Sequence, residues 1–151
     1  MLAEELGHYW QTSKTAPDIW LDKTEGMIEV HGGVVLSRGH GKAEGREAYM
    51  LAFELEGRPY KIIWPVLGSK RSERSARIQA ATLLHHDVKS KIVAAKVLGN
   101  RTAFFQYLIL ADGRTTAEVA DPELLDMLPD LNRPLLTNGD VIDAEWREET
   151  R

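Results

Sequence analysis

The 151-residue sequence contains no cysteine. This absence excludes disulfide bonds, thiolate metal sites and a cysteine nucleophile, and it is typical of a cytoplasmic protein. No apolar run approaches the roughly 20 residues that a membrane-spanning helix needs. The first ten residues are acidic and short of apolar side chains, so they do not have the pattern of a secretory signal. We therefore expect a cytoplasmic protein with no membrane partner.

Sequence motifs of the common catalytic classes are also missing. The chain has no Walker loop, no dinucleotide-binding glycine pattern and no nucleophile elbow. The adjacent His85 and His86 would diverge by about 100° on a helix, which makes them a poor ligand pair for one metal ion. The spacing of Asp18 and Asp87 resembles a nuclease pattern only superficially, because Asp87 falls in a predicted helix rather than a strand. The sequence thus predicts no catalytic residue, no metal site and no cofactor. Whether the chain is an enzyme stays open, and we expect a non-enzymatic protein.

The charges that are present are distributed unevenly. Residues 58–101 carry 10 basic and two acidic side chains, a net charge of +8, whereas the whole chain has a net charge of −4. The flanking segments 1–57 and 102–151 have net charges of −5 and −7. A basic segment attracts phosphate-rich partners even in an acidic protein. The alternative is that the basic and acidic elements neutralise one another across the folded surface.

The pattern of the chain predicts one domain with two appendages. Residues 1–16 are expected to form an N-terminal arm, residues 17–129 a single α+β domain, and residues 130–151 an acidic tail. The domain is expected to contain a three-stranded antiparallel sheet packed by an N-terminal helix and a long basic helix, in α-β-β-β-α order, with a C-terminal helical arm.

Two helices of the domain have clear boundary signals. Pro17 suits the first turn of a helix over residues 17–31, which Gly32 and Gly33 would end. Residues 72–98 contain neither glycine nor proline and are rich in alanine and leucine, so they predict the longest helix. Within it, Asp87 and Lys91 project onto the apolar side at a spacing that suits an ion pair.

The strands are predicted from alternation. A short strand over residues 34–37 is expected to lead into a glycine-containing loop over residues 38–45. Residues 47–55 and 60–66 predict a hairpin with one buried face. Pro65 indicates an edge position or the end of the second strand.

The region after the long helix is less regular. Residues 103–111 fit either a strand or a short buried helix. Thr115 and Glu118 have capping-box spacing, and Asp121 with Pro122 indicates a second helix start. The apolar face of that second helix would consist of Leu124, Leu125 and Leu128. The acidic tail is expected to pack as an arm or to order on a partner.

The predicted order of elements resembles that of a double-stranded-RNA-binding domain. The segment from Gly68 to Arg77, followed by Ala80 and Ala81, looks like the basic, alanine-rich start of the last helix of that family. In that family, lysines and the helix N-terminus contact phosphates, and the loop with Gly39, His40 and Gly41 lies where the family places a loop in the minor groove. The resemblance therefore implies phosphate contacts at the start of the long helix.

A second resemblance covers residues 77–118. These residues look like a family of small phage and prophage proteins to which no activity can be assigned. The matching segments are the pair Leu83-Leu84, the run from Lys89 to Ile92 and the run from Leu108 to Glu118, with a looser match at His8-Tyr9-Trp10 and in the hairpin. The sequence departs from the family at residues 103–106, where acidic residues are expected, and at Ala111, where proline is usual. The resemblance implies an origin in a mobile element and no mechanism.

These observations lead to a hypothesis of a non-enzymatic protein that binds DNA or RNA through the phosphate backbone. Cations at the start of a helix oppose the helix dipole, which is mild evidence for an anionic partner; a solvated face, or pairing with the acidic tail, is the structural alternative. The residues predicted to contact nucleic acid are Lys70, Arg71, Arg74, Arg77, His85, Lys89, Lys96 and His40. The competing hypothesis is a protein–protein interaction or inhibitor module that binds a host protein through the acidic C-terminal arm. The oligomeric state does not follow from the sequence.

Overall fold

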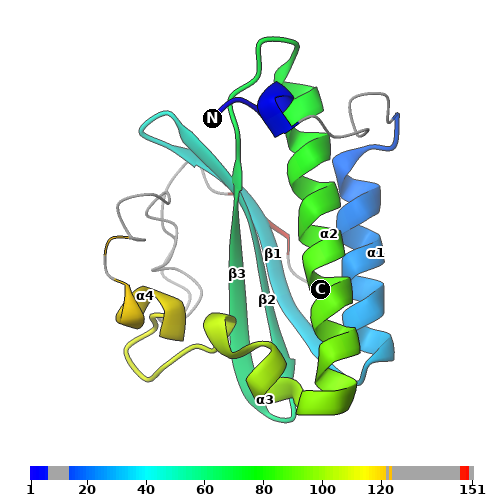
Figure 1. Ribbon diagram of the computed structural model, residues 1–151, viewed down its shortest axis with the longest axis vertical. Coiled ribbons are helices and arrows are strands. Elements are labelled where there is room, and N and C mark those ends of the chain that lie inside the picture. Colours follow the sequence, from blue (N-terminus) through cyan, green and yellow to red (C-terminus); the bar gives the residue numbers. More distant parts are fainter. Residues whose placement is uncertain (7–13, 122, 124–146, 150–151) are drawn as a thin grey trace.

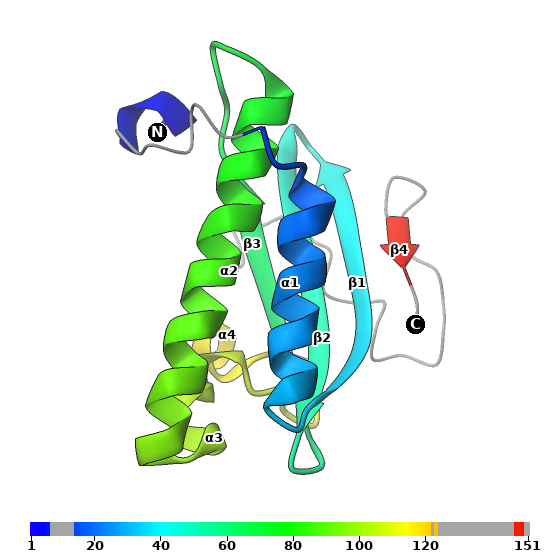
Figure 2. The ribbon, with the colours of Figure 1, turned by 90° about the vertical axis from the view of Figure 1, so that its right-hand side faces the viewer.

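The computed structural model describes residues 1–6, 14–121, 123 and 147–149 (Figure 1). Their fold is α+β: three long antiparallel strands form a sheet, and two long helices pack side by side on one of its faces (Figures 1 and 2). The predicted α-β-β-β-α order is confirmed. Among the described helices, none combines the length and the apolar composition that crossing a bilayer requires.

The two long helices begin and end where the sequence predicted. Helix α1 (Pro17–Val30) starts at a proline and is followed by Gly32 in a left-handed conformation. Helix α2 (Glu73–Leu98) begins after Ser72, whose side-chain oxygen accepts a hydrogen bond from Ser75 N at 3.0 Å. It ends at Gly99, where φ is +87°. The short 3₁₀ helix η1 (Ala3–Leu6) packs against the beginning of α2 through Ala3.

The strands are β1 (Val34–Ala43), β2 (Arg46–Leu55) and β3 (Arg58–Val66). The predicted hairpin of β2 and β3 is confirmed, and β3 forms the edge of the sheet, as Pro65 indicated. The sheet order is β3-β2-β1-β4, because the short strand β4 (Arg147–Glu149) adds to the outer edge of β1.

Strand β1 corrects the prediction of a loop over residues 38–45. The pairing of β1 with β2 continues through Gly39 and Gly41 as far as Ala43, and only Glu44 and Gly45 form the turn. Both strand glycines, Gly39 and Gly41, are buried. His40 therefore lies on a strand and not in a mobile loop.

The main core lies between the sheet and the two helices. It contains one face of β2, together with residues of β3, α2 and the segment after α2. These core residues include Tyr49, Leu51, Phe53, Leu55, Tyr60, Leu84, Val88 and Phe104. The rings of Phe53, Tyr60 and Phe104 pack together with centroids 5.6–5.9 Å apart. The prediction of one buried hairpin face was wrong, because the opposite face of β2 is buried as well, at Ala48, Met50 and Ala52.

The segment after α2 consists of short helical elements and leads to the other face of the sheet (Figure 1). Helix α3 (Asn100–Ala103) and the 3₁₀ helix η3 (Phe105–Tyr107) follow, so residues 103–111 are neither one strand nor one helix. Leu108 then forms a bridge with Tyr60 on β3, and the chain continues to helix α4 (Thr116–Ala120) on the side of the sheet opposite α1 and α2 (Figure 1). Helix α4 begins with the predicted capping box. The predicted helix face at Leu124, Leu125 and Leu128 lies outside the described residues, as does most of the acidic tail.

Candidate nucleic-acid interface

Five basic side chains line one polar cleft of about 630 Å³ between α1, β1 and the beginning of α2. Three of them come from β1 and two from α2: Arg38, His40, Lys42, Arg74 and Arg77. Tyr49 and Leu21 also line the cleft, and Asp18 is the acidic residue among the described lining residues. The structure thus places three of the predicted contact residues, His40, Arg74 and Arg77, at one site.

A β-bulge turns the cations of β1 toward this cleft. The register of β1 against β2 shifts between Val35, which pairs with Phe53, and Ser37, which pairs with Ala52. Because side chains alternate along a strand, one extra residue moves every later side chain to the opposite face. His40 consequently pairs with Tyr49 on the face toward the helices. Arg38 and Lys42 share that face, since each lies two residues from His40.

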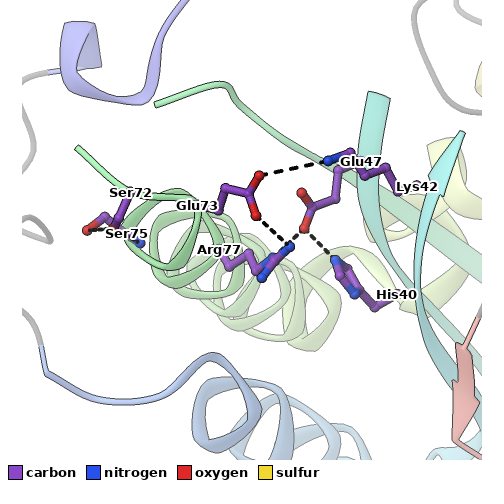
Figure 3. A network of polar contacts seen from close by, with 7 residues as sticks. All are labelled: His40, Lys42, Glu47, Ser72, Glu73, Ser75 and Arg77. Atoms are coloured by element: carbon purple, nitrogen blue, oxygen red, sulfur yellow. Dashed lines mark hydrogen bonds and ion pairs between the residues drawn. The ribbon is translucent and has the colours of Figure 1, made fainter. Parts of the chain in front are cut away.

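Glu47 on β2 connects two basic residues of the cleft, His40 and Arg77 (Figure 3). Its Oε1 accepts hydrogen bonds from His40 Nε2 and from Arg77 Nε, both at 2.5 Å. Burial raises the pKa of this carboxyl, but the two hydrogen bonds and the two neighbouring cations outweigh that effect and lower the pKa to about 2. Glu47 therefore stays ionised and holds both basic side chains in one orientation.

Glu73 extends the network at the first turn of α2. Its carboxylate lies 3.5 Å from Arg77 Nη2 and 3.9 Å from Lys42 Nζ (Figure 3). The side chains of Glu73 and Lys42 are 71% and 52% exposed, so water screens their attraction and leaves Lys42 accessible. Arg77 retains Nη1, which has no acceptor among the described residues, and this group can still donate to a ligand in the cleft.

Arg74 is an accessible cation of the cleft. It is exposed, and the described part of the chain offers it no acidic partner. Lys70 and Arg71 are exposed just before the N-cap of α2. The backbone N–H of Arg71 donates to Glu4 Oε1 at 3.0 Å, and Ser69 donates to the same oxygen. These contacts fix the segment that carries the cations, and they lower the pKa of Glu4, with the Ser69 bond as the main cause.

Arg38 has a structural role at the rim. Its Nη1 contacts Asp22 at 2.7 Å and Glu25 at 3.3 Å, and both acids belong to α1. The side chains of Arg38 and Glu25 are 12% and 4% exposed, so this contact connects β1 to α1 and leaves little of the Arg38 charge for a ligand.

The remaining predicted contact residues lie at the other end of the helix pair. His85, Lys89 and Lys96 line a separate groove between the C-terminal halves of α1 and α2. Between the two sites, Trp20 packs edge-on against His85, with ring centroids 5.1 Å apart. Thr24 Oγ1 donates to Trp20 O at 2.8 Å and lies 3.2 Å from His85 Nδ1. Burial, together with the neighbouring cations, lowers the pKa of His85.

The ion pair predicted within α2 is confirmed and is structural. Lys91 Nζ lies 2.8 Å from Asp87 Oδ1, and the hydroxyl of Tyr107 donates to Asp87 Oδ2 at 2.6 Å. Burial and the Asp87 carboxylate raise the pKa of Tyr107. This cluster attaches η3 to α2 and is remote from the cleft.

Sequence reasoning missed Arg38 and Lys42 as cleft residues. The signal was present, because Arg38, His40 and Lys42 alternate at strand spacing. The glycines between these residues favoured a loop instead of a strand.

No group of three or more metal-ligating side chains is placed to hold a metal ion in the portion of the chain that the structure describes. Comparisons with protein-family models, curated proteins and solved structures find no match for this chain.

Proposed function

We propose that this protein is a non-enzymatic nucleic-acid-binding protein and that the cleft at the beginning of α2 contacts phosphates. The observation that supports the proposal is the convergence of cations from two distant segments, β1 and α2, on one polar cleft. Arg74, Lys42 and the remaining N–H group of Arg77 can donate to phosphate oxygens there.

The local geometry at the start of α2 also favours anions. The helix dipole places partial positive charge at this end of a 26-residue helix. Lys70 and Arg71 add exposed basic side chains beside it, whereas Glu47 and Glu73 already compensate part of the charge on Arg77. We therefore assign the phosphate contacts to Lys42, Arg74, Arg77, Lys70, Arg71 and His40, and we separate His85, Lys89 and Lys96 from this set.

The order of elements favours a duplex as the ligand. It is the order of double-stranded-RNA-binding domains, which recognise a duplex by its shape and its backbone. The proposal also includes a cytoplasmic location, which the cysteine-free composition supports, and an origin in a phage or another mobile element.

The proposal can be tested by fluorescence anisotropy with labelled single- and double-stranded DNA and RNA, titrated from low to high salt. Contacts to about five or six phosphates predict a slope of log K against log salt near −5. Arg74→Glu should weaken binding to all sequences at least tenfold, and Arg74→Ala should reduce the slope by about one.

Lys96→Glu is the matched control, because it makes the same charge reversal on the same helix outside the cleft. It should leave the affinity nearly unchanged once the salt is near physiological, where the Debye length is about 8 Å. An absence of binding at low salt would refute the proposal. Equal losses for Arg74→Glu and Lys96→Glu would refute the assignment to the cleft.

A further inference from the structure

The groove between the C-terminal halves of α1 and α2 is apolar at its centre and basic at its rim. It has a volume of about 700 Å³. Its apolar lining consists of Met27 and Val30 from α1 and Ile92 and Val93 from α2. This groove lies about 16 to 33 Å along α2 from Arg74, at 1.5 Å per residue, and it shares no lining residue with the cleft.

The apolar side chains of this region are unusually exposed. Val30 is 91% exposed, Val93 is 59% exposed, and Val97, one turn beyond Val93, is 84% exposed. Single exposed apolar residues need no explanation, whereas a contiguous group beside a groove is typical of an interaction site. Two neighbouring helices with an apolar groove between them suit a third amphipathic helix.

The charges around the groove specify the kind of helix. Among the described residues that line it, three are lysines (Lys23, Lys89 and Lys96) and none is acidic. Asp22 and Glu25 of α1 face β1 instead, where they contact Arg38. A second copy of this chain docked groove to groove would bring lysines against lysines, which is unfavourable. The carboxylates of an acidic partner could form ion pairs with all three lysines.

Gly26 gives the groove a feature that the fold itself does not require. It lies in the interior of α1, where glycine costs up to about 1 kcal/mol relative to alanine. A Cβ atom at this position would meet no other atom within 4 Å. The absence of a side chain therefore opens the groove without serving any internal contact, and it lets the side chains or backbone of another helix approach closely.

From these observations we propose that the C-terminal halves of α1 and α2 dock an acidic amphipathic helix of a partner protein. Its apolar face would lie on Met27, Ile92 and Val93, and its acidic flanks would pair with Lys23, Lys89 and Lys96. The inference is independent of the function assigned to the cleft, because it uses a different surface.

The test is a titration of the intact ¹⁵N-labelled chain with a synthetic 18-residue amphipathic helical peptide of leucine, alanine and glutamate, followed by NMR. The matched probe is the same peptide with lysine in place of every glutamate. The glutamate peptide should shift amide signals in the C-terminal halves of α1 and α2, and the lysine peptide should not. Equal binding of both peptides, no shifts with either at millimolar concentration, or shifts confined to other surfaces would overturn the proposal.

Two variants make the test specific. Gly26→Leu fills the groove and should weaken binding of the glutamate peptide at least tenfold, while the melting temperature shows whether the fold is kept. Lys89→Glu should weaken binding of the glutamate peptide and strengthen binding of the lysine peptide. This reversal of preference tests the proposal without a change at Gly26. Arg74→Glu is the control that should change neither. If a DNA or RNA duplex produces the groove shifts and the glutamate peptide does not, the occupant is nucleic acid and the proposal fails.

Discussion

Replacement of Glu47 by glutamine should destabilise the fold and at the same time strengthen its binding to nucleic acid. The substitution keeps the shape of the side chain and removes its negative charge. Glutamine cannot serve His40 and Arg77 as a shared anionic acceptor, so two basic groups lose the partner that holds them at 2.5 Å. Stability and affinity should therefore move in opposite directions.

The size of the stability change follows from the pKa of Glu47. A decrease from 4.5 to about 2 corresponds to roughly 3 kcal/mol of stabilisation at neutral pH. The side chains of His40 and Arg77 are each 32% exposed, so water can partly replace the lost acceptor. We expect Glu47→Gln to reduce the free energy of unfolding by about 1–3 kcal/mol at pH 7.

The contribution of Glu47 to stability should depend on pH in a defined direction. Because the pKa of Glu47 is lower in the folded state, its stabilisation is complete above about pH 4.5 and is lost as the pH falls toward 2. Urea unfolding at pH 7 and at pH 2.5 should therefore show a large difference between wild type and variant at pH 7 and a smaller one at pH 2.5. A difference that is the same at both pH values would refute the assigned role of this carboxylate.

The affinity change provides the second readout. Removal of one negative charge beside the proposed phosphate contacts should favour binding by about 1 kcal/mol at low salt, or roughly fivefold. Glu44→Gln is the matched control, because Glu44 is 83% exposed and pairs with Arg46 in the turn after β1. It should change stability by less than about 0.5 kcal/mol. If Glu47→Gln instead binds nucleic acid more weakly, the expected gain is refuted. The orientation that Glu47 gives to the Arg77 side chain would then contribute more to binding than the removal of the negative charge.

Four further variants test the scaffold. Gly33→Ala should destabilise the fold by about 1–3 kcal/mol, because its Cβ would lie 2.7 Å from two core side chains, whereas Gly26→Ala should stabilise it by up to about 1 kcal/mol; urea denaturation measures both. Tyr107→Phe removes the 2.6 Å hydrogen bond to Asp87 and should cost about 1–3 kcal/mol in the same assay. His85→Gln should reduce the loss of stability below pH 6.5, because the lowered pKa of His85 makes its protonation oppose folding; unfolding curves at pH 7.5 and pH 5 test this.

The local signals of the sequence were sufficient for the elements with regular periodicity. The β2–β3 hairpin was predicted from alternating apolar residues on both sides of a turn over residues 56–59. In the structure β3 already begins at Arg58, and the turn consists of Glu56 and Gly57, which both adopt positive φ. Helix α2 follows from a long run without glycine or proline between Ser72 and Gly99. The Thr115 capping box was equally readable, because its two partners are three residues apart.

The features that the sequence did not predict depend on contacts between distant segments. The pairing of Gly39 and Gly41 with β2 is one example, since local propensity favours a loop. Lys61 is another: an ordinary strand position gives no sign that its side chain is 1% exposed and that its Nζ donates to Gly113 O, 52 residues away, at 3.4 Å. The charge pattern indicated that α2 is basic. It did not indicate which of its cations line the cleft and which line the groove.

The parallel packing of α1 beside α2 produces that division. The N-terminal ends of the two helices frame the cleft, their C-terminal halves frame the groove, and the contact of Trp20 with His85 lies between them. Arg74 and Lys89 are 15 residues apart on one helix, or about 22 Å, which is more than twice the Debye length at physiological salt. The two sites should therefore be energetically independent: Arg74→Glu and Lys89→Glu should act additively on stability, and a saturating glutamate peptide should leave nucleic-acid affinity unchanged within twofold. Coupling larger than this between the two ligands would require a shift of α1 against α2, which chemical shifts at Trp20 and His85 would report.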